Sequence, residues 1–432
     1  MSPSTSTLVE TFLGALEGTI SVLLTLLAGY VMAKRGYLDR KTVRSISKQC
    51  TTLFLPCLIV EQMGPHLTKS KLSDVWIVPL WGFVSTGIAH LIGWAGKHVF
   101  KLPYWTITAC GRTNANALPL LLLQSLEKTG VLDTLAQEGE SLSETLSRAK
   151  TLILLNSIVQ QTFTFELAPS IMARDRRETK VDLGRQDRLA EDGNRLPGVV
   201  QDPERVGLLD NIEGDNDLDE PERTWHEQRR AREAMADITD VPDVHWPHAL
   251  HPLEGPVRKV ASFMRPPLIA AIVALILGVM PQLHTVFLDP DGPLYVSITQ
   301  SVVNLGELFV ALQTFVVGAE LAVLPSANPG VFATSWVLFV RFVVMTAISL
   351  LFVWSTAGRG LYVDDLMVWF ILVLAPVGPS AMLLASVAEM VDVSQGPVAG
   401  YLIIAYLASP LMAVVCSLGL EVVESAAGRA GL

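Results

Sequence analysis

Ten apolar runs constrain this chain more than any other feature of its sequence. The hydrocarbon core of a bilayer is ~30 Å thick, so a helix needs ~20 apolar residues to cross it. Hydrophobic residues make up 50% of the chain and charged residues 17%, against ~25% charged in a typical soluble domain. Because only helices and closed barrels satisfy their backbone in lipid, we expect an all-α membrane protein with transmembrane helices at roughly Leu8–Ala33, Gln49–Met63, Val75–Phe100, Tyr104–Leu126, Lys150–Met172, Val260–Phe287, Leu294–Leu324, Val331–Ala357, Asp365–Met390 and Pro397–Val423.

The runs fall into two sets of five, which predicts an internal repeat. Residues 1–173 form the first set and residues 257–432 the second, with a polar insert at 174–256 between them. An odd number of spans per set places the second copy inverted in the membrane. The fourth and ninth runs also resemble each other, because proline interrupts both and a leucine pair and a serine follow. We therefore expect two inverted five-helix repeats whose fourth and ninth helices are broken and cross.

The insert carries most of the excess negative charge. The whole chain has a net charge of −10, and residues 174–255 hold 12 Lys and Arg against 21 Asp and Glu, a difference of −9. This composition predicts a mostly disordered segment, either a solvated tether or a docking and phosphorylation region for cytosolic partners. Basic residues gather in the loop 34–48 and beside the insert, so we expect a cytosolic insert and non-cytosolic termini.

The fourth run holds the most informative polar cluster. Arg112, Thr113, Asn114 and Asn116 lie in the middle of an apolar span, just before Pro119. Polar groups at this depth are costly unless they are paired or face a cavity, and proline cannot continue the hydrogen bonding of a helix. The sequence therefore predicts a broken helix whose free N–H groups and Asn amides suit a carboxylate. Arg112 could bind that carboxylate, pair with a membrane acid or extend to the interface.

The ninth run predicts the matching half of the site. Pro376, Gly378 and Pro379 interrupt it, and Ser380 adds a hydrogen-bond donor. Two broken helices that meet near mid-membrane form a substrate site in transporters with inverted repeats.

Three further polar groups in the apolar runs have open roles. Glu320 and Arg341 could form an ion pair that orders their helices or couples transport to protons. His90 could relay protons or be a satisfied, hydrogen-bonded histidine.

Several motifs together resemble one family. They are Leu53-Phe-Leu-Pro-Cys-Leu-Ile59, Met264-Arg-Pro-Pro-Leu-Ile-Ala-Ala271, Val317-Gly-Ala-Glu-Leu-Ala322 and Ala375-Pro-Val-Gly-Pro-Ser-Ala381, with the proline break of the fourth run. In this order they resemble the auxin efflux carrier family, nearest its PIN-like branch and fungal members. The resemblance implies ten helices in two inverted repeats, alternating access, indole-3-acetic acid or a similar anion as substrate, and the endoplasmic reticulum membrane, with the plasma membrane or vacuole as alternatives. It places family site residues at Asn114, Asn116, Pro119, Pro376 and Pro379.

Other function classes find no support in the sequence. It has no Walker A loop, no hydrolase or zinc-protease motif, no cysteine pair with metal-ligand spacing and no basic stripe typical of nucleic-acid binding. We therefore predict a secondary transporter of a small organic anion that is not an enzyme and needs no cofactor or metal. A sodium- or proton-coupled symporter and a membrane receptor or scaffold acting through the insert are the alternatives, and a homodimer is left open.

Overall fold

The structure is almost entirely helical, as the apolar runs predict. The computed structural model describes residues 5–67, 74–115, 117–128, 131–137, 139–193, 266–324, 326–391 and 393–431. Within these ranges there is no β-strand, and extended pairing is limited to one isolated bridge, between Thr113 and Ser380.

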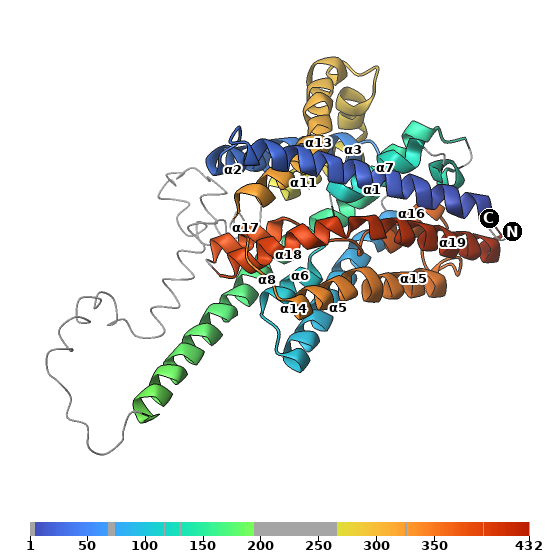
Figure 1. The fold of residues 1–432 in the computed structure, drawn as a ribbon. Helices are drawn as coiled ribbons and strands as arrows, with labels where there is room; N and C mark the ends of the chain where they lie inside the picture. Colours follow the sequence, from blue (N-terminus) through green and yellow to red (C-terminus); the bar gives the residue numbers. More distant parts are fainter. Residues whose placement is uncertain are drawn as a thin grey trace, which may run out of the picture.

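Helices lie in each of the ten predicted runs (Figure 1). The N-terminal part contains α1 (Thr5–Lys34), α2 (Arg40–Gln49), α3 (Leu55–Met63), α5 (Ile77–Phe100), α6 (Trp105–Gly111), α7 (Ala117–Lys128) and α8 (Leu142–Gly193), with the π-helical turn η1 (Cys50–Phe54) and the 3-10 turn η2 (Val131–Leu135). The C-terminal part contains α11 (Pro266–Val279), α12 (Pro281–Leu283), α13 (Gln300–Val323), α14 (Val331–Phe339), α15 (Met345–Thr356), α16 (Leu366–Leu374), α17 (Leu383–Met390), α18 (Gln395–Leu407) and α19 (Met412–Ala430), with the π-helical turns η6 (His284–Leu288), η7 (Tyr295–Thr299) and η8 (Val340–Val344) and the 3-10 turn η9 (Ser409–Leu411).

Helix α8 is longer than the sequence predicts. It begins at Leu142 and continues to Gly193, beyond the predicted boundary at residue 173. Residues 174–193 contain no proline and five Arg, a residue that favours a helix. The helix therefore continues into the first part of the predicted insert. The rest of the insert, 194–256, lies outside the described residues.

Five helices are long and apolar enough to cross a membrane, among the residues that the structure describes. They are Phe12–Lys34, Ile77–Phe100, Tyr295–Val323, Val331–Thr356 and Ser409–Ala430. A sixth span would combine Pro266–Val279 with Pro281–Leu288, which meet at a bend of 94°. These helices establish a protein that crosses the membrane several times.

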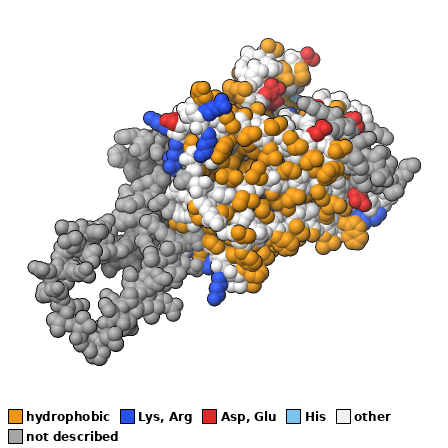
Figure 2. Space-filling view, viewed as in Figure 1, with side chains coloured by type: hydrophobic (Ala, Val, Ile, Leu, Met, Phe, Trp, Pro, Cys, Tyr) orange, Lys and Arg blue, Asp and Glu red, His pale blue; other side chains and the backbone are white. Residues whose placement is uncertain are grey.

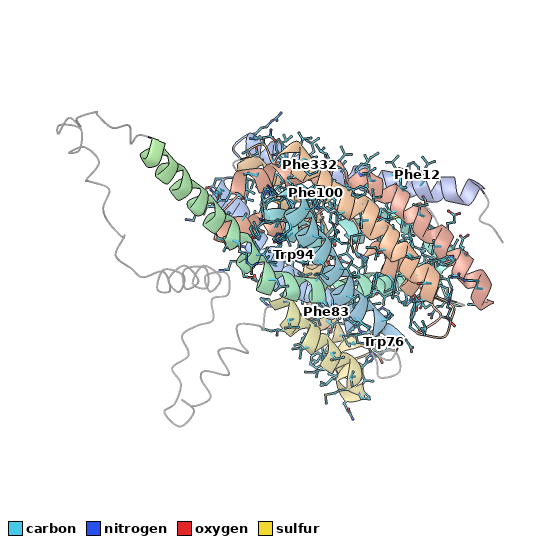
Figure 3. All side chains as sticks on the ribbon, turned by 90° about the horizontal axis from the view of Figure 1, so that it is seen from below. Phe12, Trp76, Phe83, Trp94, Phe100 and Phe332 are labelled. Carbon is cyan, nitrogen blue, oxygen red and sulfur yellow. The ribbon has the colours of Figure 1, made fainter. Side chains whose placement is uncertain are left out.

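The outer surface of the bundle suits lipid. Figure 2 shows a wide hydrophobic face, with Lys and Arg side chains gathered at the left end of the view. Along α5, Phe83, Trp94 and Phe100 are 49%, 51% and 43% exposed, and Phe332 on α14 is 56% exposed (Figure 3). So many exposed apolar side chains would be a liability in water, whereas lipid solvates them.

Two glycines allow α1 and α13 to touch backbone to backbone. A Cβ at Gly29 would lie 1.9 Å from the carbonyl oxygen of Phe315, and a Cβ at Gly318 would lie 1.9 Å from that of Leu26. Small residues permit this close approach between membrane helices, where dispersion contacts drive association. The first helix of the N-terminal part is thus packed directly against the C-terminal part.

A partly buried charged cluster also joins the two parts. Arg148 of α8 donates to Asp365 Oδ1 and to Glu140 Oε2, both at 2.7 Å. Asp365 in turn caps α16 by accepting from the backbone N–H groups of Met367 and Val368. Although partial burial raises the pKa of Glu140, hydrogen bonds from Arg148 and from a backbone N–H outweigh it and hold that pKa below its usual value.

Replacing Arg148 by methionine should destabilise the fold. Loss of the guanidinium leaves Asp365 and Glu140 together without a counter-charge. Breaking a fully buried pair costs about 3–5 kcal/mol, and we expect a smaller loss for this partly buried cluster. We expect a lower thermal midpoint in detergent, with part of the loss recovered in the double variant Arg148→Met/Asp365→Asn. A carboxylate with a depressed pKa stabilises above its ordinary pKa of about 4 and loses that effect as the pH falls. The thermal midpoint of the wild type should therefore approach that of Arg148→Met at acid pH. Equal midpoints of the two proteins at neutral pH would contradict this account.

Candidate functional site

The fourth apolar run is broken where the sequence predicts. Helix α6 ends at Gly111 and α7 begins at Ala117, so Arg112 leaves the helix with an extended backbone. Pro119 lies in the first turn of α7, not in the gap itself. That turn has no intrahelical acceptor for its N–H groups, so the missing N–H of proline costs nothing there.

The ninth run is broken in the same way. Helix α16 ends at Leu374 and α17 begins at Leu383. Between them Pro376, Gly378 and Pro379 are all buried. Gly378 has a φ of +111°, a backbone conformation that favours glycine over any residue with a Cβ.

The two breaks pair with each other through their backbones. The N–H of Asn114 donates to the carbonyl of Pro379 at 2.9 Å, and the N–H of Ala381 donates to that of Arg112 at 3.2 Å. These are the two hydrogen bonds of the antiparallel bridge between Thr113 and Ser380. We call residues 112–115 and 375–382 the crossing. Its two hydrogen bonds pair some of the backbone N–H and C=O groups that lose their helical partners at the breaks.

Arg341 stabilises the crossing from a third segment. It lies in η8, is 1% exposed, and donates from Nε to the carbonyl of Gly378 at 2.9 Å. It also donates from Nη1 to the carbonyl of Cys110 at 3.1 Å and from Nη2 to Thr113 Oγ1. The planar guanidinium, with five donors in a fixed fork, can reach all three acceptors at once.

The predicted pairing of Arg341 with Glu320 is therefore not what the structure shows. All three of its hydrogen-bond acceptors are uncharged. The breaks at Gly111 and Leu374 leave carbonyls without helical partners, and these compete successfully for the guanidinium.

Two tyrosines of α18 complete the polar lining. Ser380 donates to the carbonyl of Ala109 at 2.7 Å, and its Oγ lies 2.6 Å from the hydroxyl of Tyr401. The amide Nδ2 of Asn114 donates to the hydroxyl of Tyr406 at 3.1 Å. Thr113, Asn114 and Ser380 are thus hydrogen-bonded within this region in this state, and a ligand would exchange with their partners.

The structure brings together most of the residues that the sequence singled out. Arg112, Thr113, Asn114, Pro376, Gly378, Pro379 and Ser380 lie in the crossing, with Pro119 beside it in α7 and Arg341 bound to it. Arg112 is 3% exposed, so it does not extend to the interface. Asn116 lies outside the described residues.

Sequence reasoning missed Tyr401 and Tyr406. Both lie in the last apolar run, and both are almost fully buried. A buried tyrosine hydroxyl needs a partner, so two tyrosines five positions apart in an apolar helix could have indicated a nearby polar site.

Comparison with known proteins agrees with this geometry. The chain matches the family model described as "Membrane transport protein" over residues 15–416. It is 24% identical to an uncharacterized transporter of Schizosaccharomyces pombe over 71% of this chain and 70% of the relative. Two Arabidopsis thaliana proteins are also similar: PIN-LIKES 6, at 25% identity over 78% of this chain and 76% of its own, and PIN-LIKES 2, at 24% over 83% and 82%. The chain therefore belongs to the membrane transport protein family of auxin efflux carriers, together with the PIN-LIKES proteins and fungal transporters, and is itself a membrane transporter.

Proposed function

We propose that this transporter moves a small organic anion such as indole-3-acetate by alternating access, with the crossing as its binding site. The observation that carries this proposal is the charge of Arg341, which is held at the crossing by uncharged acceptors. A buried cation without a carboxylate partner is costly in an apolar interior, and an anionic ligand would offset that cost.

The surrounding groups also favour an anion. The first turns of α7 and α17 follow the two breaks, and a helix N-terminus carries partial positive charge. Asn114 supplies an amide donor in the first break, and Arg112, two residues earlier, is buried. Donors and positive charge from both breaks would surround one carboxylate.

The proposed architecture is two inverted five-helix repeats that rock about the crossing. The pairing of the fourth and ninth runs supports this arrangement, because broken helices of inverted repeats meet at the substrate site. We place the loop 34–48 and the central insert in the cytosol, in accordance with the basic residues in that loop and beside the insert. The family resemblance supports the endoplasmic reticulum as the membrane.

Replacing Asn114 by alanine should weaken anion binding. A hydrogen bond to a charged group contributes about 1.5–3 kcal/mol, so we expect the dissociation constant for indole-3-acetate to rise roughly tenfold to a hundredfold. Equilibrium binding of the radiolabelled anion to purified protein measures this. Asn304→Ala is the matched control, because Asn304 is an exposed asparagine of α13. Equal affinity in wild type and Asn114→Ala would remove the crossing as the site.

A proton-coupled form of this transport is favoured by one observation. The Oε2 atom of Glu61 in α3 is buried without a hydrogen-bond partner, while its Oε1 accepts from Gln62 at 2.6 Å. Lys150 and Glu307 are the charged groups of neighbouring helices that act on it. Burying a charged oxygen without a partner is unfavourable, so the carboxyl would take up a proton in this state. Glu61→Gln should then abolish the effect of a pH gradient on the part of the uptake that exceeds the level of protein-free liposomes. An unchanged effect of the gradient on that part would contradict proton coupling through Glu61.

A further inference from the structure

His90 of α5 lies against the end of the broken helix α6. Its side chain is 8% exposed. A Cβ at Gly111 would lie 2.1 Å from both Nδ1 and Cε1 of the ring, so the imidazole packs directly on the backbone of the last residue before the crossing. Because Gly111 has no side chain, the ring can lie next to the proposed binding site.

The hydrogen bond of Nδ1 fixes the tautomer of the ring. Nδ1 lies 2.8 Å from the carbonyl oxygen of Thr86, one turn earlier in the same helix. A carbonyl oxygen can only accept, so Nδ1 carries the proton and donates it. In a neutral imidazole the other nitrogen, Nε2, then presents a lone pair and can only accept.

The Nε2 atom is buried and has no hydrogen-bond partner. A buried acceptor without a donor costs about 1–3 kcal/mol, so this atom favours a ligand that brings a donor.

We propose that His90 Nε2 accepts a hydrogen bond from the transported anion, so that the carrier selects anions that also bear an N–H or O–H group. This inference rests on the proposed function, because it assigns specificity to the same site. The arginines and amides of the crossing would bind the carboxylate, and His90 would recognise the donor elsewhere on the molecule. Indole-3-acetate carries both groups, a carboxylate and a ring N–H.

A comparison of two ligands tests the inference. Indole-3-acetate and its N1-methyl derivative have the same charge and nearly the same shape, but the methylated ring has no donor. We expect the wild type to bind indole-3-acetate about tenfold more tightly, a ratio equivalent to ~1.4 kcal/mol. His90→Leu should bind both with equal affinity, and His90→Gln should recover part of the preference, because its amide oxygen can accept.

His98→Leu is the matched control, since His98 is an exposed histidine of the same helix. It should keep the wild-type preference. Equal binding of both ligands by the wild type would overturn the role of His90 while leaving the anion site intact. A preference that persists in His90→Leu would overturn it as well.

A second measurement does not depend on the choice of anion. Nitrogen NMR of protein labelled with ¹⁵N-histidine should show a resonance of a neutral ring with an unprotonated Nε2, and this signal should vanish in His90→Leu. A protonated Nε2 at position 90 would overturn the inference even if neither indole ligand bound, whereas failure of both ligands to bind with the expected tautomer present would count against the proposed function alone.

Discussion

Replacing Gly318 by alanine should destabilise the carrier severely. The added methyl group would lie 1.9 Å from the carbonyl oxygen and 2.6 Å from the carbonyl carbon of Leu26. Backbone atoms of a helix cannot move aside as a flexible side chain can, so α1 and α13 would have to separate along their contact. Overpacking in a dense interior costs typically 1–3 kcal/mol and occasionally more, and we expect the upper end of this range.

The thermal midpoint of the purified protein in detergent measures this effect. Gly87→Ala is the matched control, because Gly87 lies in α5 with nothing within 4 Å of a built Cβ. Alanine favours a helix over glycine by about 1 kcal/mol, so the control should be neutral or stabilising. Equal midpoints for the two variants would show that α1 and α13 do not pack as described.

Replacing Arg341 by methionine should remove transport. The carbonyls of Cys110 and Gly378 and the hydroxyl of Thr113 would lose their shared donor, and each buried group left unsatisfied costs about 1–3 kcal/mol. The crossing would also lose the positive charge that attracts the anion. We expect uptake below one hundredth of the wild-type rate.

Arg341→Lys separates the structural role from the charge. Lysine keeps the positive charge but lacks the planar fork that reaches three acceptors. We expect part of the anion affinity to return while the thermal midpoint stays low. Wild-type transport by Arg341→Met would contradict the assignment of Arg341 to the crossing.

Much of the fold could be predicted from apolar patterning, because lipid imposes a minimum length on every span. The breaks at Arg112–Asn116 and around Pro379 could also be predicted, since proline, glycine and polar residues coincide there. The continuation of α8 to Gly193 could not be predicted from charge alone, because a charged sequence can be either helical or disordered.

The partners of the site residues were harder to predict than its location. Arg341 lies more than two hundred positions from Cys110 and still binds its carbonyl. A sequence shows which side chains are polar, and the obvious partner of a membrane arginine is an acid. It does not show that two helix breaks offer several unsatisfied acceptors in one place. Tyr401 and Tyr406 were missed for the same reason. Their role comes from hydroxyl contacts with Asn114 and Ser380, which are far away in the sequence.

Uptake of radiolabelled indole-3-acetate into liposomes that hold the purified protein tests the central claim most directly. Protein-free liposomes must be measured in parallel, because the protonated weak acid crosses bilayers unaided. An imposed potential is worth ~2.3 kcal/mol per charge per 100 mV. The account predicts saturable, potential-dependent uptake above the protein-free level, reduced in Asn114→Ala and lost in Arg341→Met. Uptake that never exceeds the protein-free level, or that is the same in all three proteins, would contradict an organic anion carrier that binds its substrate at the crossing.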